Sequence, residues 1–330
     1  MADFRTIKGL YIKHVSSDPS NLVEGDIWYN TTTQTLKTAP LIAAWASGTN
    51  MPVATNAAAG AGTSTAAFLT SGNTPAGSRV VTTFEYDGSS WGSGGDINTG
   101  RDNLSAACNS SIPAGLVFGG STPSVTGATE EYNGTAWTES GDLNTARNSW
   151  IGGVGTQTAA LAAGGGPSYK NESEEYDGST WTEGNNLNVS RQGLGQGGTQ
   201  TAGLVFGGEI PGSPSASTST EEYDGTSWTA GEAMGAGRYR VQGCGTQTSA
   251  IAFLGRINPP ASDSTVAQTY DGTDWATTSS LATARQQAAG FGASGLSAVA
   301  AGGYVSASDA NSLLTEEFSA TVTLKTVTDS

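Results

Sequence analysis

One short motif returns five times along this chain at nearly equal intervals. The motif is Tyr-(Asp/Asn)-Gly-x-x-Trp, and its tyrosines are separated by 46, 44, 47 and 47 residues. They are Tyr86, Tyr132, Tyr176, Tyr223 and Tyr270. A period in this range is typical of solenoids, propellers and other repeat arrays. Residues that recur in every unit are therefore expected to build the fold, and function is expected where the units differ.

The rest of each unit has the pattern of short β-strands. Asp-Gly or Asn-Gly between Tyr and Trp favours a tight hairpin, because that turn needs positive φ angles. A polar stretch ending in Arg follows, then a Gly-rich run, often Gly-Thr-Gln-Thr, and a short apolar run that ends in Gly-Gly. The apolar runs are too short for ordinary helices and are bounded by turn residues. About 46 residues hold four strands with their turns, which is one propeller blade.

The incomplete units at the two ends indicate how many blades there are. Trp45 lies 46 residues before Trp91, and Phe318 lies 48 residues after Tyr270 in the position of the motif tyrosine. If a strand near Trp45 joins the last blade beside Phe318, the units form a six-bladed ring with no open end. We therefore predict an all-β fold, a six-bladed β-propeller closed by N- and C-terminal strands. Residues 321–328 are the alternative source of the closing strand, and a β-solenoid is the alternative fold.

The order of Gly-Gly, Tyr, Trp and Arg in each unit resembles the kelch repeat. The resemblance covers roughly residues 40–320 and implies a propeller. The gap between Tyr and Trp is shorter than in kelch repeats. Asp-Gly-x-x-Trp also resembles the Asp-box of sialidase-like propellers, with a different spacing. Neither resemblance transfers a function, since one fold serves many functions.

Residues 1–38 lie outside the repeat, and we expect them to form a small hairpin segment beside a propeller spanning 39–330. The stretch Gly25–Asn30, Gly-Asp-Ile-Trp-Tyr-Asn, resembles a segment of structural proteins of tailed bacteriophages. That resemblance implies attachment to other virion proteins, with Trp28 and Tyr29 as the attachment residues. The alternative is a hairpin that caps the propeller, with Trp28 as packing.

Composition excludes several classes of partner. The formal net charge is −15 with an isoelectric point near 4.3, which argues against electrostatic binding of nucleic acid or anionic membranes. We expect neither a signal peptide nor a membrane-inserted segment. Cys108 and Cys244 fall on opposite blades of the predicted ring, so we expect two free thiols and assembly in a reducing cytoplasm.

No catalytic constellation stands out. His14 is the only histidine and precedes the repeat, which excludes histidine triads and multi-histidine metal sites within the ring. We expect no enzyme activity, no cofactor and no metal. One arginine recurs in each unit, and a structural role for the set is expected (Arg101, Arg147, Arg191, Arg238 and Arg285). The same holds for the recurring Glu-Glu pairs, because adjacent strand residues point to opposite faces (130–131, 174–175, 221–222 and 316–317).

The linkers between the second and third strands of the blades are the least regular part of the repeat. They span 121–129, 166–173, 209–220, 256–269 and 304–315. Loops on a rigid scaffold commonly carry binding, and neutral drift of loop sequence is the alternative. The candidate ligand-binding residues are Tyr169, Lys170, Arg256, Asn258, Tyr304 and Asp309.

The function predicted from these features is structural. We expect a non-enzymatic bacteriophage virion protein, a tail-fibre-like appendage or a capsid decoration, that is located on the virion and binds host-surface carbohydrate. A soluble lectin-like or protein-interaction propeller unrelated to virions is the alternative, followed by a polysaccharide hydrolase.

Overall fold

A computed structural model of the chain describes residues 6–7, 10–148, 151–212 and 216–327. All regular elements in these ranges are β-strands, as predicted. The chain divides into two compact units, one comprising Trp45–Phe318 and the other Met1–Ala44 with Ser319–Ser330. Residues 213–215 of the predicted linker 209–220 lie outside the described ranges.

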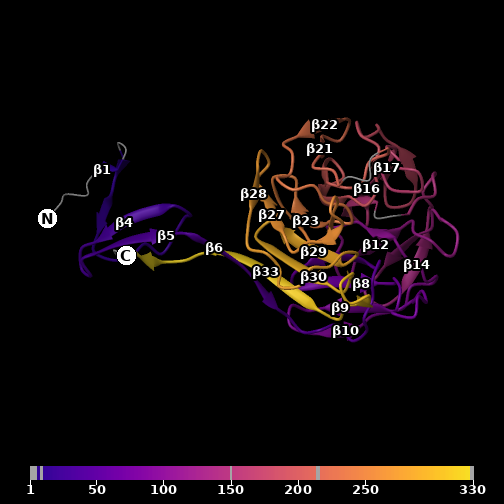
Figure 1. The fold of residues 1–330 in the computed structure, drawn as a ribbon, viewed down its shortest axis with the longest axis horizontal. Helices are drawn as coiled ribbons and strands as arrows, with labels where there is room; N and C mark the ends of the chain where they lie inside the picture. The colour runs from indigo at the N-terminus through magenta and orange to yellow at the C-terminus, as the bar shows by residue number, and fades with distance from the viewer. Residues whose placement is uncertain (1–5, 8–9, 149–150, 213–215, 328–330) are drawn as a thin grey trace. The chain divides into compact units, whose positions relative to one another are not determined.

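The larger unit is a six-bladed β-propeller whose blades follow one another around a ring (Figure 1). Each blade is a four-stranded antiparallel sheet, with its strands in order from the axis outward. Blade one is β7 (Ala59–Thr63), β8 (Ala66–Thr70), β9 (Thr83–Tyr86) and β10 (Trp91–Ser93); blade two is β11 (Ser105–Ala106), β12 (Gly115–Phe118), β13 (Thr129–Tyr132) and β14 (Trp137–Ser140); blade three is β15 (Gly152–Thr156), β16 (Ala159–Ala163), β17 (Ser173–Tyr176) and β18 (Trp181–Glu183). Blade four is β19 (Gly195–Thr199), β20 (Ala202–Phe206), β21 (Thr220–Tyr223) and β22 (Trp228–Gly231); blade five is β23 (Gln242–Thr246), β24 (Ser249–Phe253), β27 (Ala267–Tyr270) and β28 (Trp275–Thr277); blade six is β29 (Ala289–Ser294), β30 (Ser297–Ala301), β33 (Thr315–Val322) and β6 (Leu41–Ser47).

The ring closes through the N-terminal strand, as the two incomplete repeats predicted. Blade six takes its outermost strand, β6, from the beginning of the chain and its other three from the end. The innermost strands contact one another in succession, and β29 of blade six contacts β7 of blade one. The ring of Trp45 packs 5.2 Å from that of Phe318. The alternative closing segment does not serve, because β34 (Lys325–Thr326) pairs with β5 in the other unit; residue 328 lies outside the described ranges.

The hydrophobic core lies between the blades. Each buried cluster combines residues of two neighbouring blades, as where Leu116 and Phe118 meet Ala160 and Ala162. The motif tyrosine and tryptophan face each other across their hairpin, with ring centroids 4.8 to 4.9 Å apart in all five copies. Aromatic side chains bury large apolar areas, so these pairs stabilise the packing of successive blades.

The smaller unit contains one four-stranded sheet, in the order β3 (Lys13–Val15), β4 (Asp26–Asn30), β5 (Thr35–Ala39) and β34. The strands β1 (Thr6–Ile7) and β2 (Leu10–Tyr11) form a separate two-stranded hairpin. The predicted boundary at residue 38 is therefore displaced. Residues 39–44 and the chain beyond Phe318 belong to this unit, because the chain returns to pair β34 with β5.

Candidate functional site

Most of the recurring arginines form buried ion pairs with the recurring glutamates. Arg101 Nη2 lies 2.8 Å from Glu130 Oε1, and both side chains are fully or almost fully buried. The same ion pair recurs in three further blades, as Arg147–Glu174, Arg191–Glu221 and Arg285–Glu316. Burial lowers the pKa of the Arg101 guanidinium, and the charge of Glu130 opposes that shift. The predicted structural role is confirmed, and these repeated groups offer no site.

In most blades a second glutamate follows on the third strand, directly before the motif tyrosine. Its carboxylate points to the opposite side of the sheet, toward the next blade. The Tyr132 hydroxyl donates to Glu85 at 2.7 Å, and Tyr176 donates to Glu131 at 2.6 Å. Tyr86 donates likewise to Glu317, which joins blade one to blade six. Desolvation and these hydrogen bonds raise the pKa of the phenols above its usual value. These repeat residues therefore join neighbouring blades through a tyrosine–glutamate hydrogen bond, which we call the inter-blade hydrogen bond.

The boundary between blades five and six lacks both residues of this inter-blade hydrogen bond. Thr269 stands where other blades have the accepting glutamate, and Phe318 stands where they have the donating tyrosine. Both partners of the hydrogen bond are thus replaced together. Blade five also replaces the glutamate that pairs with the arginine by Gln268, whose Oε1 lies 3.1 Å from Arg238 Nη2. Burial without a carboxylate partner lowers the pKa of Arg238 to about 10.

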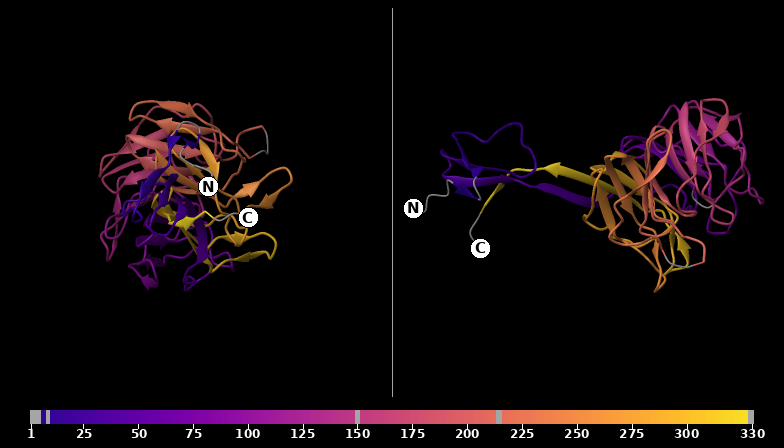
Figure 2. Two further views of the ribbon diagram at one scale, coloured as in Figure 1. Left: turned by 90° about the vertical axis from the view of Figure 1, so that its left-hand side faces the viewer. Right: turned by 90° about the horizontal axis from the view of Figure 1, so that it is seen from above.

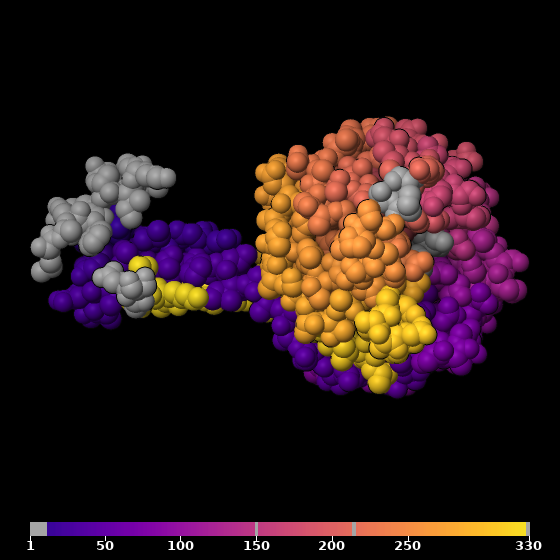
Figure 3. Space-filling view, in the orientation of Figure 1, coloured from indigo at the N-terminus to yellow at the C-terminus, as the bar shows by residue number. Residues whose placement is uncertain are grey.

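The same two blades carry the most elaborate linkers of the described propeller. In blade five the linker forms the hairpin β25 (Arg256–Ile257) and β26 (Ser262–Asp263); in blade six it forms β31 (Tyr304–Val305) and β32 (Ala310–Asn311). Both project from one face of the ring, in orange and yellow in Figure 2. Figure 3 shows them as neighbouring elevations. We call this pair of hairpins, with the adjoining residues just before β23 and β29, the blade-five/six face.

A polar network joins the two hairpins. Arg256 Nη1 lies 2.9 Å from Ser306 Oγ and 3.6 Å from Asp263 Oδ1. The backbone amide of Ser306 donates to Asp263 Oδ2 at 2.7 Å. Gln286 Nε2 donates to the same serine hydroxyl at 2.9 Å, while its Oε1 accepts from Arg240 Nη1 at 2.7 Å. Contacts from both hairpins and from the residues before both inner strands therefore hold this face rigid.

Partly exposed aromatic and charged groups belong to the same face. The Arg240 guanidinium lies over the Tyr239 ring, 5.7 Å from its centroid. Burial lowers the pKa of Arg240, and the nearby charge of Arg256 acts in the same direction. The Tyr304 hydroxyl donates to Asp309, and that hydrogen bond raises the pKa of the phenol. The face offers guanidinium donors, a carboxylate acceptor and partly exposed aromatic rings, which suit a hydroxyl-rich ligand.

The structure brings together four of the six predicted ligand-binding residues. Arg256, Asn258, Tyr304 and Asp309 belong to the blade-five/six face, where Asn258 is half-buried in the turn between β25 and β26. Tyr169 and Lys170 lie instead on blade three, where Lys170 Nζ is 3.9 Å from Glu172 Oε1. The other members of the network were not predicted from the sequence; they are Tyr239, Arg240, Asp263, Gln286 and Ser306. Their one signal is position, since Arg240 and its neighbours follow the repeated arginine, where the blades differ in side chain.

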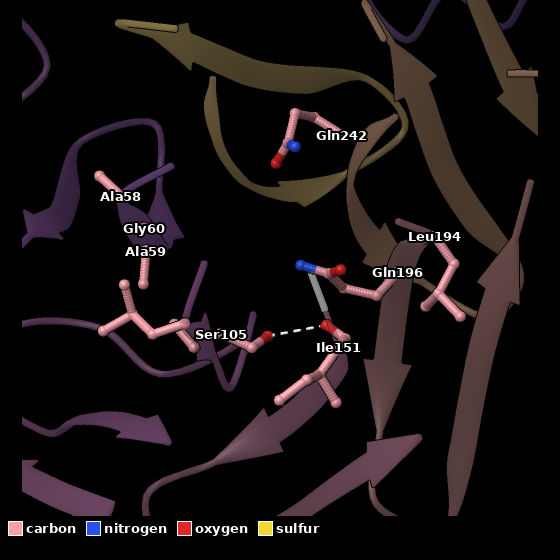
Figure 4. Close-up of a pocket in the computed structure, with 10 residues that line it drawn as sticks. Ala58, Ala59, Gly60, Ser105, Ile151, Leu194, Gln196 and Gln242 are labelled. Atoms are coloured by element: carbon pink, nitrogen blue, oxygen red, sulfur yellow. Dashed lines mark hydrogen bonds between the residues drawn. The ribbon is translucent and has the colours of Figure 1, made fainter. Parts of the chain in front are cut away.

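A small pocket lies on the propeller axis at the starts of the inner strands. Its lining includes Ser105, Ile151, Leu194, Gln196 and Gln242 (Figure 4). Ser105 Oγ donates to the carbonyl of Ile151 at 2.9 Å. None of the described residues that line it is ionisable, so they supply no acid or base for catalysis.

The chain crosses the axis at the other ends of the inner strands. β11 has only two residues, and the segment after it leaves the sheet. The amide of Cys108 donates to Gly153 O at 3.1 Å, and Asn109 Nδ2 donates to Gly198 O at 2.7 Å, two blades away. Cys108 and Cys244 are both buried and free, as predicted. Burial raises the pKa of Cys108 to about 12, so this thiol is not an activated nucleophile.

The predicted attachment residues lie on the smaller unit. Trp28 is 2% exposed and donates from Nε1 to Asp18 Oδ1 at 3.0 Å. Its burial agrees with the alternative, in which Trp28 is a packing residue, and its role in attachment stays a prediction. Tyr29 is half-buried beside His14, with ring centroids 5.2 Å apart. Within the described ranges, no helix is long and apolar enough to cross a membrane, and no three His, Cys, Asp or Glu side chains gather as a metal site.

Comparison with known proteins supports the fold alone. No protein-family model matches the chain, and no curated protein matches it. Among solved structures, it is similar to the one described as "Structure of YjhT", with a TM-score of 0.68 and 14% sequence identity. The match covers 84% of this chain and 99% of that one. At this identity the likeness bears out a β-propeller and carries no function.

Proposed function

We propose that this chain is a non-enzymatic structural protein of a bacteriophage virion, displayed as an appendage or decoration, with a kelch-like propeller that binds host-surface glycan. One observation carries the non-enzymatic part of the proposal: the repeated ionisable and aromatic groups are engaged in joining blades. The virion part rests on the resemblance of Gly25–Asn30 to a segment of tailed-bacteriophage structural proteins. Groups used for packing are not free for chemistry. What remains non-repetitive is the smaller unit and the blade-five/six face.

The glycan part of the proposal rests on the chemistry of the blade-five/six face. Sugars present many hydroxyl groups and apolar ring faces, so their sites combine planar hydrogen-bonding groups with aromatic surface. Arg240 and Tyr239 lie together there, beside Tyr304 and Asp309. The hairpins are held by the Arg256, Asp263 and Ser306 contacts, and such preorganisation reduces the ordering cost of binding.

A glycan array with matched variants tests the binding. Tyr239→Ala removes the aromatic surface beneath Arg240 and is expected to lower the affinity for any bound glycan at least about tenfold. Tyr169→Asn on blade three is the control, since asparagine tolerates the left-handed backbone found there (φ 51°), and should bind like the parent. Equal affinity of Tyr239→Ala and the parent for the bound glycan would mean that the binding site is not on the blade-five/six face.

The virion part is tested on particles. Mass spectrometry and immunogold labelling of purified virions should detect the chain, and its absence would count against the proposal. Deleting residues 1–38 together with 324–330 removes most of the smaller unit and should abolish incorporation while the propeller still melts cooperatively. Glycan binding without particle association would favour the alternative, a soluble lectin-like propeller.

A further inference from the structure

The sheet of the smaller unit has two unlike faces. Paired residues of neighbouring strands project to the same side of a sheet. The register pairs His14 with Tyr29 and Tyr29 with Leu36, and the amide of Val327 bonds to the carbonyl of Leu36. Ile27 is two residues from Tyr29 on β4 and shares this side. One aromatic or apolar residue from each inner strand and from the end of β34 thus forms a row, which we call the open face.

The opposite face is covered by the chain's own residues. It carries Trp28 and Asn30, and both donate hydrogen bonds to Asp18 Oδ1 in the segment before β4. Both side chains are buried. On the open face, by contrast, Ile27 and Val327 are each 46% exposed.

The smaller unit is short of core. Its buried apolar side chains in the described ranges are Trp28, Ala39 and Ala320. Of the nine exposed large apolar side chains among the residues that the structure describes, five belong to this unit, although it is much the smaller one (Val23, Ile27, Ile42, Leu324 and Val327). An exposed sheet face that carries apolar side chains is stabilised by a second layer, and small units often obtain such a layer by association.

Charge favours a like partner for this unit. Its sequence contains five Lys or Arg and five Asp or Glu, so the net charge of −15 resides wholly in the propeller. Two neutral units can approach without the repulsion that opposes contact between acidic propellers. Both edge strands carry an exposed lysine, Lys13 on β3 and Lys325 on β34, and edge lysines disfavour edge-to-edge strand pairing. Lys325 pairs with Thr38, the partner of Ile27, so it stands at the β34 edge of the open face, where its aliphatic stem can cover apolar surface while the ammonium reaches water. The remaining mode is face to face.

We propose that the open face is a self-association surface, on which the same face of a second copy of this chain packs across a two-fold axis. Ile27, Leu36 and Val327 of each copy would complete a two-layer sandwich of the kind formed by packed sheets. This inference goes beyond the proposed function, and it can be tested on purified protein without any virion or glycan.

Sedimentation equilibrium over about 1–100 µM tests it, a range that spans weak to moderate association. The intact chain is expected to approach twice the 33.3 kDa of one copy as concentration rises. Ile27→Asp should remain a monomer throughout. Val53→Asp is the matched control, because Val53 is 41% exposed on the propeller, and it should associate like the parent. A parent that stays monomeric at every concentration would overturn the proposal.

Cross-linking separates loss of contact from loss of folding. The two natural cysteines are buried and free, so Ile27→Cys introduces one exposed thiol per chain. A bismaleimide that reaches roughly 10 Å, the spacing of packed sheets, should convert most of this variant to a covalent dimer, and at least about ten times more than Val53→Cys at the same concentration. Equal yields from the two variants would mean that the open faces do not meet.

Discussion

Removing the carboxylate of Glu130 should destabilise the propeller strongly, because the Arg101 guanidinium would be left buried without a counter-charge. Glu130 Oε1 accepts from Arg101 at 2.8 Å, and Oε2 accepts from the amide and the side chain of Asn98, each at 2.8 Å. Breaking a buried ion pair by removing one partner costs about 3–5 kcal/mol. We expect that cost for Glu130→Ala.

A conservative change should cost less, and blade five shows why. There Gln268 occupies the equivalent position and accepts from Arg238 through its amide oxygen. Glu130→Gln keeps such an acceptor but presents an NH₂ group to one of its present donors. The loss should therefore be about 1–3 kcal/mol, the range for unsatisfied buried polar groups. The predicted order of stability is parent, Gln, then Ala.

Urea denaturation and thermal melting at pH 7 measure these losses. At about 2 °C per kcal/mol for a domain of this size, Glu130→Ala should lower Tm by on the order of 6–10 °C. Glu139→Ala is the matched control, because Glu139 is an exposed glutamate directly across the ladder, and its effect should stay within about 0.5 kcal/mol. An alanine variant that melts within about 2 °C of the parent would refute the reasoning.

Three further changes test other parts of the ring. Phe318→Tyr alone should give no stabilisation, whereas adding Thr269→Glu should create the inter-blade hydrogen bond that blades five and six lack. A double-mutant cycle is therefore expected to show favourable coupling of about 0.5–3 kcal/mol, and additive effects would contradict this expectation. The raised pKa of Tyr176 means that folding favours the neutral phenol. Its contribution to the free energy of unfolding is therefore complete below about pH 10 and is lost as pH rises above that value. Spectrophotometric titration should show phenols that ionise only when the protein unfolds, and reversible ionisation in the native state would contradict this. A thiol reagent should leave Cys108 and Cys244 unmodified in native protein and label both in denaturant, and fast native labelling would contradict their burial.

The ring was predictable because its determinants repeat. The spacing of the motif indicated the blade, and the orphan Trp45 and Phe318 revealed the closure. The structural role of the arginines followed from their equivalence, since five copies at one position around a ring do not converge on one site. In this ring the sequence period and the structural period coincide.

The candidate site was less predictable because its members come from different blades. Arg256 and Ser306 are fifty residues apart, and only the ring brings their hairpins together. Arg240 follows the repeated arginine at a position where the blades differ in side chain, and that position is the one signal that the sequence gives for it. The burial of Trp28 could not be decided from the sequence, because a buried tryptophan and an exposed one look alike there. The pairing of β34 with β5 was missed because a two-residue strand carries no period.

The borrowed strand of blade six has a consequence for the order of folding. Strand β6 is synthesised long before its partner β33, which is complete only after residue 322. At roughly 5–20 residues per second, β6 waits on the order of tens of seconds with its hydrogen-bonding edge unpaired. The first five blades can form in sequence during that interval, whereas the last cannot. Closure is therefore a late step, and a chain that is truncated before β33 retains an open edge able to capture a strand from another molecule.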